Sequence, residues 1–157
     1  DGAYVLAWAD PEPRLLHVGG TRSKAWIPVP CDPALSGSIS AAHDGTVWLT
    51  CSTGTQARIF VGTGSEPFVE VPHGPLPNSV QVAARTARDA IVSVGPEQPL
   101  RRLTSNGELA PVAKPPVTGV QTDYVGFTSP DVGYALVGTE LWRTDDGGDV
   151  WAPIRIR

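Results

Sequence analysis

The chain has 157 residues, of which 41% are hydrophobic and 18% are charged, and its formal net charge is −4. These values fit one soluble globular domain that can bury a sizeable core, and they exclude a disordered tail. The longest apolar runs fall far short of the roughly 20 residues that a transmembrane helix needs, and the scattered arginines form no basic stripe, so we expect neither a membrane span nor a nucleic-acid partner.

Glycine and proline, with 17 and 16 residues, are spread along the chain rather than gathered in one linker. This distribution is typical of many short strands joined by tight turns, and no stretch shows sustained helical spacing. We therefore expect a single all-β domain that spans residues 1–157. The absence of methionine, the initiator included, predicts a processed or excised piece from which any export signal is already gone.

Short apolar segments, bounded by Gly, Pro or Asp-Gly as β-strands are, recur along the chain. The first unit, about residues 1–38, contains "YVLAWA", "RLLHVG" and "WIPVP". The second unit, about 39–79, opens at Ile39 with "ISAA" and continues with "TVWLTCS", "ARIFVG" and "FVEVP". Each of these units therefore predicts a series of short strands in the same order.

The third and fourth units repeat this order. The third, about 80–119, reads "VQVAA", "AIVSVG", "LRRLTS" and "LAPVA", and the fourth, about 120–157, reads "VQTDYVGF", "GYALVG", "ELWRT" and "WAPIRI". The last segments step by 42, 41 and 42 residues, since they begin at Trp26, Phe68, Leu109 and Trp151. A period of about 40 residues is typical of propeller blades and solenoids.

Four short strands per unit at this period predict a β-propeller of about four blades, each with four antiparallel strands. By the same spacing the first unit lacks its innermost strand, so we expect about fifteen strands and a partial or half ring. Unclosed sheet edges offer unpaired backbone groups. Either the parent protein is longer, or two copies complete a ring of about eight blades, with "WAPIRIR" and "GAYVLAWA" as the pairing segments.

Residues 141–154, "LWRTDDGGDVWAPI", predict a hairpin between the third and fourth strands of the last unit, because Asp-Gly and Gly-Gly favour tight turns. Within it, the pattern formed by Thr144, Asp146, Gly148 and Trp151 resembles the Asp-box, or BNR, motif of secreted bacterial propellers, including sialidase-like and Ycf48-like proteins. The resemblance implies a structural, peripheral hairpin. The other units carry reduced copies of the motif, "TSNGEL", "VGTGSEPF" and "GGTRSKAW".

Cys31 follows the first unit's last strand, and Cys51 lies in the second unit's "TVWLTCS" segment, so they would be neighbours across a blade boundary. Two cysteines in an exported domain favour a disulfide, worth about 3 kcal/mol in chain-entropy models, although two buried thiols in a cytosolic protein are the alternative. The resemblance supports the disulfide and an extracellular or cell-envelope location. Two cysteines without a CxxC motif give no zinc or redox site.

Candidate binding residues lie near the ends of the predicted inner strands: His43, Asp44, Arg85, Asp123 and Tyr124. The alternative is that all five are ordinary solvated turn residues. The histidines share no metal-ligand spacing, and no GxGxxG, P-loop or GxSxG motif is present, so we expect no metal and no cofactor.

The pattern favours a non-catalytic module that binds a protein or glycan partner through loops on a rigid scaffold. The alternative is part of a sialidase-like glycoside hydrolase. The resemblance implies that such an enzyme needs three arginines and a tyrosine beside a carboxylate. Here only Arg85 is a plausible central arginine, and Asp123 with Tyr124 is the nearest pair.

Overall fold

The computed structural model describes residues 2–7, 13–19, 22–32, 36–63, 66–95, 100–116 and 119–155, and within them the regular secondary structure consists of β-strands. Fifteen strands form four antiparallel sheets, which follow one another in chain order and which we call blades 1 to 4. Blade 1 has three strands and each of the others has four.

Each predicted segment overlaps one strand, but the fourth strands of blades 2 to 4 are shorter than the segments predicted for them. Blade 1 contains β1 (Gly2–Ala7), β2 (Arg14–Gly19) and β3 (Arg22–Pro28). Blade 2 contains β4 (Gly37–Ala41), β5 (Thr46–Ser52), β6 (Ala57–Thr63) and β7 (Val69–Glu70). Blade 3 contains β8 (Gln81–Ala84), β9 (Asp89–Ser93), β10 (Arg101–Thr104) and β11 (Leu109–Pro111). Blade 4 contains β12 (Thr122–Phe127), β13 (Gly133–Val137), β14 (Glu140–Thr144) and β15 (Ala152–Pro153).

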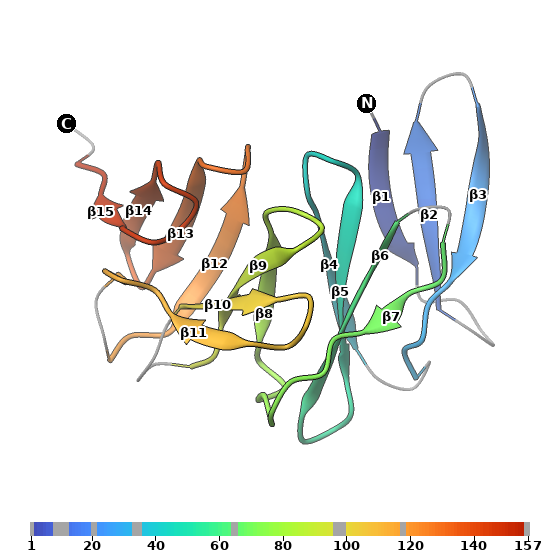
Figure 1. The fold of residues 1–157 in the computed structure, drawn as a ribbon, viewed down its shortest axis with the longest axis horizontal. Coiled ribbons are helices and arrows are strands. Elements are labelled where there is room, and N and C mark those ends of the chain that lie inside the picture. Colours follow the sequence, from blue (N-terminus) through green and yellow to red (C-terminus); the bar gives the residue numbers. More distant parts are fainter. Residues whose placement is uncertain are drawn as a thin grey trace.

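The blades stand side by side, with blade 1 and blade 4 at opposite ends of the row (Figure 1). Strands are hydrogen-bonded in the order of the sequence within every blade, so each blade is a simple meander. The first strands of blades 2, 3 and 4, namely β4, β8 and β12, are neighbours across the blade boundaries. The prediction of an all-β propeller segment that forms a partial ring is confirmed, and the described residues of blade 1 form three strands, as expected of a blade without its inner strand.

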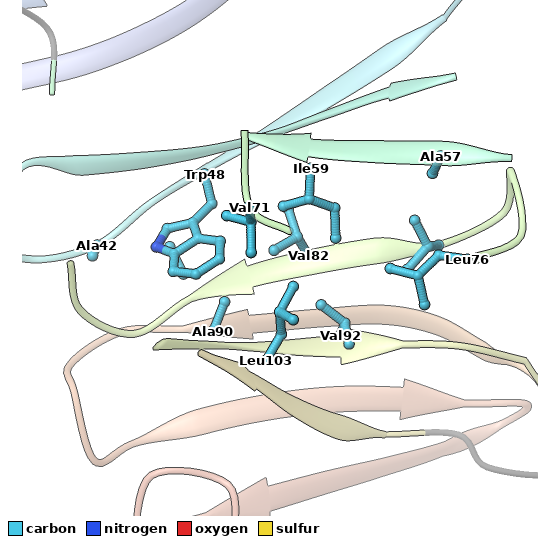
Figure 2. Packing of buried hydrophobic residues seen from close by; sticks show 12 residues of the cluster. Ala42, Trp48, Ala57, Ile59, Val71, Leu76, Val82, Ala90, Val92 and Leu103 are labelled. Atoms are coloured by element: carbon cyan, nitrogen blue, oxygen red, sulfur yellow. The ribbon is translucent and has the colours of Figure 1, made fainter. Parts of the chain in front are cut away.

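Apolar side chains fill the space between neighbouring blades. Between blades 2 and 3, Trp48 and Ile59 pack with Val82, Val92 and Leu103 in one buried cluster, which Figure 2 shows at close range. Because β-strand side chains alternate between the two faces of a sheet, a blade can bury one set of residues on each side. Burial on both sides explains why β5 and β9 are buried along almost their whole length.

A disulfide joins blade 1 to blade 2. Cys31 follows β3, Cys51 lies in β5, and their Cα atoms are 5.1 Å apart. Both residues are buried in the cluster between these two blades, together with Leu15 and Leu49. The predicted disulfide is confirmed.

Among the described residues there is no helix with the length and hydropathy that crossing a bilayer requires.

Candidate functional site

The five predicted binding residues lie at two different ends of the inner strands. His43 and Asp44 lie in the loop that follows β4, and Arg85 directly follows β8. Asp123 and Tyr124 instead lie at the start of β12. Hydrogen bonds join neighbouring inner strands near their starts and also join the segments that follow their ends. The inner strands therefore begin at one edge of the molecule and end at the opposite edge. The structure therefore brings three of the predicted residues to one edge and leaves the other two at the opposite edge.

Asp44 fixes the first loop of blade 2 to the first loop of blade 3. Its Oδ1 accepts a hydrogen bond from the Thr46 N–H (2.9 Å), and its Oδ2 accepts one from the Ala87 N–H (3.0 Å). Beside it, the indole N–H of Trp48 donates to the Thr86 carbonyl (2.9 Å). Partial burial opposes the charged form, but the hydrogen bonds from Thr46 and Ala87 outweigh it and hold the pKa of Asp44 below its ordinary value.

Arg85 fixes blade 3 to blade 4 in a similar way. Its Nε donates to the Pro130 carbonyl (2.8 Å), and its Nη1 pairs with Oδ2 of Asp89 (2.5 Å). The guanidinium lies against Gly147, whose φ is +76° and whose Cβ, if present, would be 2.6 Å from the Arg85 Cζ. Only glycine combines this backbone conformation with so close an approach.

Asp89 and Arg102 extend this contact into a network that the sequence analysis missed. Asp89, only 9% exposed, also pairs with Nη1 of Arg102 (2.6 Å). Nη2 of Arg102 reaches Oδ1 of Asp149 (2.7 Å) and the Gly147 carbonyl (3.2 Å), both in blade 4. The sequence contained one signal for this network. Asp89 pairs with Thr104 in the β9–β10 register, so Arg102, two residues before Thr104, lies diagonally across from Asp89 and carries the opposite charge.

The turn between β14 and β15, residues 144–151, is closed by its own side chains. The Thr144 hydroxyl donates to Oδ1 of Asp146 (2.8 Å) and accepts the N–H of Gly148 (2.9 Å). The same Asp146 oxygen accepts the N–H groups of Asp149 (3.1 Å) and Val150 (3.0 Å). The Val150 hydrogen bond is the largest cause of a pKa of Asp146 below its ordinary value.

Trp151 packs against this turn and anchors it. Its side chain is fully buried, its indole N–H donates to the Gly148 carbonyl (2.9 Å), and its ring meets Phe127 edge-on with 6.2 Å between centroids. Its backbone N–H donates to the Lys114 carbonyl of the segment that follows β11 (3.0 Å). The turn is thus bound both to its own blade and to blade 3.

Together these contacts produce a continuous surface, which we call the loop face: residues 42–45, 85–88 and 128–132, with the turn residues 145–150. Gly147 N–H donates to the Asp131 carbonyl (2.8 Å), so the turn is attached to the loop that follows β12. The loop face exposes side chains of both charges and of neutral polar type, among them His43, Arg88, Thr128 and Asp131. Its backbone is held from blade to blade, while these side chains face solvent.

The opposite edge carries Asp123 and Tyr124. The carbonyl of Asp123 accepts a hydrogen bond from the Gln81 side chain (2.8 Å). Tyr124 is 57% exposed and covers Gly126, where a Cβ would meet the phenol oxygen at 2.2 Å. Since Arg85 lies at the other end of the inner strands, the structure does not bring it together with this Tyr and carboxylate pair.

Among the described residues, no three His, Cys, Asp or Glu side chains gather as a metal site would require.

No family model and no curated protein matches this chain. Among solved structures, it is similar to the β-propellers virginiamycin B lyase from Staphylococcus aureus (16% identity, 99% of this chain and 56% of that one, TM-score 0.58) and YCF48 from Cyanidioschyzon merolae (14%, 90% and 52%, 0.54). A structure of YCF48 bound to D1 peptide also matches (15%, 97% and 63%, 0.42). The chain spans about half the length of the first two, and at these identities the likeness shows the fold alone.

Proposed function

We propose that this chain is a non-catalytic propeller module that binds a protein partner through the loop face. The observation that supports this function is the chain of contacts Asp44 to Ala87, Arg85 to Pro130 and Gly147 to Asp131, which fixes each loop to the next. Loops held by a rigid scaffold commonly carry binding. A surface that is already ordered before binding also loses less conformational entropy when a partner arrives.

The polar and charged groups divide into two sets that suit this role. Asp44, Arg85, Asp89 and Arg102 are engaged in contacts within or between blades, which makes them positioning residues. His43, Arg88 and Asp131 lie exposed on the same face. Exposed charges of both signs give a protein surface complementary contacts and govern the rate and specificity of association.

We also propose that the turn 144–151 is an Asp-box hairpin with a structural role, and that the protein is secreted or belongs to the cell envelope. The first proposal is supported by the internal hydrogen bonds of Thr144 and Asp146 and by the buried Trp151. The second is supported by the disulfide between Cys31 and Cys51, because disulfides persist mainly in oxidising compartments.

Selection of phage-displayed peptides against the immobilised 157-residue chain tests the binding function. We expect selected peptides to lose more than about tenfold in affinity for His43→Ala or Arg88→Glu, because exposed side chains on the loop face would contact them. Val69→Ala is the matched control, since Val69 is 65% exposed on β7 and lies outside the loop face. Its affinity for the peptides should equal that of the unchanged chain.

Two results would contradict the proposal. The first is a set of selected peptides that bind all three variants equally. The second is turnover of a fluorogenic sialoside or related glycoside that Arg85→Ala or Tyr124→Phe abolishes, which would favour an enzyme. If the chain binds glycans on an array and the loop-face variants do not, the partner at this surface is a glycan rather than a protein.

A further inference from the structure

The outer edge of blade 2 continues past its last regular strand. β7 ends at Glu70 and pairs only with Phe60 and Val61 of β6. The residues that follow run on along β6 as far as Pro77, which forms an isolated antiparallel bridge with Gln56. We call residues 71–77, "VPHGPLP", the outer segment. It covers the first half of β6, which β7 leaves uncovered.

Backbone hydrogen bonds attach the outer segment to β6 at two places. The Val71 N–H donates to the Ile59 carbonyl (2.9 Å), and the Ala57 N–H donates to the Leu76 carbonyl (3.0 Å). Val71 and Leu76 are 1% and 3% exposed, and both belong to the apolar cluster between blades 2 and 3 (Figure 2). Burial of these two side chains fixes the segment at both ends.

Between these two attachments, the side chain of His73 holds the outer segment to β6. Its Nε2 accepts the N–H of Ile59 (3.2 Å), and its Nδ1 lies 2.6 Å from the Gly74 carbonyl oxygen. Because a backbone N–H can only donate, Nε2 presents its lone pair, so Nδ1 carries the hydrogen and donates to the carbonyl. This pair of contacts requires one tautomer of the neutral imidazole.

The charged groups near His73 belong to β6, β7 and the neighbouring turn of blade 3. Glu70 is close enough for its charge to interact with that of His73, and it pairs with Arg58 (2.5 Å). The blade 3 turn that packs on Pro72 carries Glu108, which is exposed. Since Arg58 offsets Glu70 and solvent screens Glu108, the two hydrogen bonds of the ring decide which form of the imidazole the fold accepts.

We propose that His73 makes the outer segment an acid-sensitive contact. A proton added to Nε2 turns this acceptor into a donor. The imidazolium and the Ile59 N–H are then two donors facing each other, and their hydrogen bond is lost. Imidazoles change charge between about pH 8 and pH 5, so the contact is present at the upper end of this range and absent at the lower end.

The movement that follows is confined to residues 72–75, because Val71 and Leu76 stay buried on either side. Pro72 and Pro75 have no N–H with which to replace the lost contact. The Pro72 carbonyl lies against Gly107 of blade 3, where a Cβ would be only 1.4 Å from its oxygen. Acid therefore also loosens the contact between blade 2 and the blade 3 turn. The inference is independent of the loop face and of its partner.

Hydrogen exchange at pH 8 and pH 5, followed by NMR, tests this proposal. Each rate is compared with that of an unstructured peptide at the same pH. We expect the protection of the Ile59 amide to fall about fivefold at pH 5, the ratio that the loss of one hydrogen bond represents. The Ala57 amide should keep its protection. The ¹⁵N shifts of the His73 ring at pH 8 should show the hydrogen on Nδ1.

Two glutamine variants separate His73 from the other groups that titrate in this range. His73→Gln takes up no proton, so the protection of its Ile59 amide should be the same at both pH values. His17→Gln, in blade 1, is the matched control and should keep the fivefold change. The proposal is wrong if His73→Gln also keeps this change, or if Ile59 in the unchanged chain is equally protected at both pH values. An equal loss at Ala57, or a hydrogen on Nε2 at pH 8, would likewise overturn it.

Discussion

The turns between the third and fourth strands of blades 3 and 4 connect equivalent strands, but different contacts hold them in place. In blade 4, Thr144, Asp146 and Trp151 close the turn from within. In blade 3, the Thr104 hydroxyl donates to Asn106 Oδ1 and accepts the Glu108 N–H (3.1 Å), but the position of the tryptophan is taken by Leu109, which is only half-buried. The eroded turn of blade 3 keeps the threonine and loses the aromatic anchor.

The blade 3 turn compensates through its neighbour. Gly107 has a φ of +92°, and a Cβ there would lie only 1.4 Å from the Pro72 carbonyl oxygen of the segment that follows β7. Backbone from blade 2 thus fills the space beside this turn. A hairpin can therefore be held in place either by its own side chains or by close contact with the adjacent blade. The sequence motif indicates only whether the hairpin's own side chains can hold it.

Trp151→Ala should have the largest effect, a loss of about 4 kcal/mol in the free energy of unfolding, because it empties a fully buried site and removes an indole hydrogen bond. Leu109→Ala, at the equivalent position of blade 3, should cost about 1 kcal/mol because less apolar surface is buried there. Urea denaturation of both variants measures the difference. Equal losses would mean that the two turns are anchored alike.

Asp89→Asn should cost about 3 kcal/mol, because it leaves two largely buried guanidinium groups without their shared carboxylate. The loss of stability should be concentrated in blade 4, because Arg102 binds Asp149 and the Gly147 carbonyl there. Hydrogen exchange of the backbone amides of residues 145–150 would then accelerate more than that of residues 104–109. Glu70→Gln, which breaks the exposed pair of Arg58 and Glu70, is the control and should cost less than about 1 kcal/mol.

Gly107→Ala should cost about 2 kcal/mol and Gly147→Ala about 1 kcal/mol. Both glycines have positive φ, but the new methyl group meets backbone at Gly107 and a side chain, that of Arg85, at Gly147. Thermal unfolding of the two variants ranks them. The reverse order would show that the close contact with Pro72 relaxes easily and that blade 3 does not depend on it.

Asp146→Asn should have the smallest effect, about 0.5 kcal/mol at neutral pH, because the amide oxygen still accepts the turn's N–H groups. The folded pKa of Asp146 is lowered from 3.8, so its charged form adds stability above that pH, and this contribution is lost as the pH falls through the lower folded value. The stability difference between the two proteins should therefore shrink as the pH falls below about 4 in urea denaturation. A difference that stays constant across this range would contradict the assignment.

The sequence predicted the strands, their order and the disulfide, but only part of the loop face. The period placed β4, β8 and β12 and identified the loops that follow them. It did not identify Asp89 and Arg102, and it presented Asp44 and Arg85 only as candidate binding residues. The structure places both in contacts between blades. A useful signal was overlooked: Asp44 and Ala87, and Arg85 and Pro130, are each about one repeat apart, so the backbone of the equivalent loop in the next unit is a candidate partner for a polar side chain.

Strand positions, turn positions and the hairpin at Thr144 to Trp151 were determined by the sequence itself, because alternation, glycine placement and side-chain capping act over a few residues. The pairing of charges between blades and the exposure of Val5 and Leu136 were decided only by the tertiary structure. Both depend on how far apart successive sheets stand and on which face each sheet turns outward. Stacking brings together residues that lie more than forty positions apart, and local patterns carry no record of that geometry.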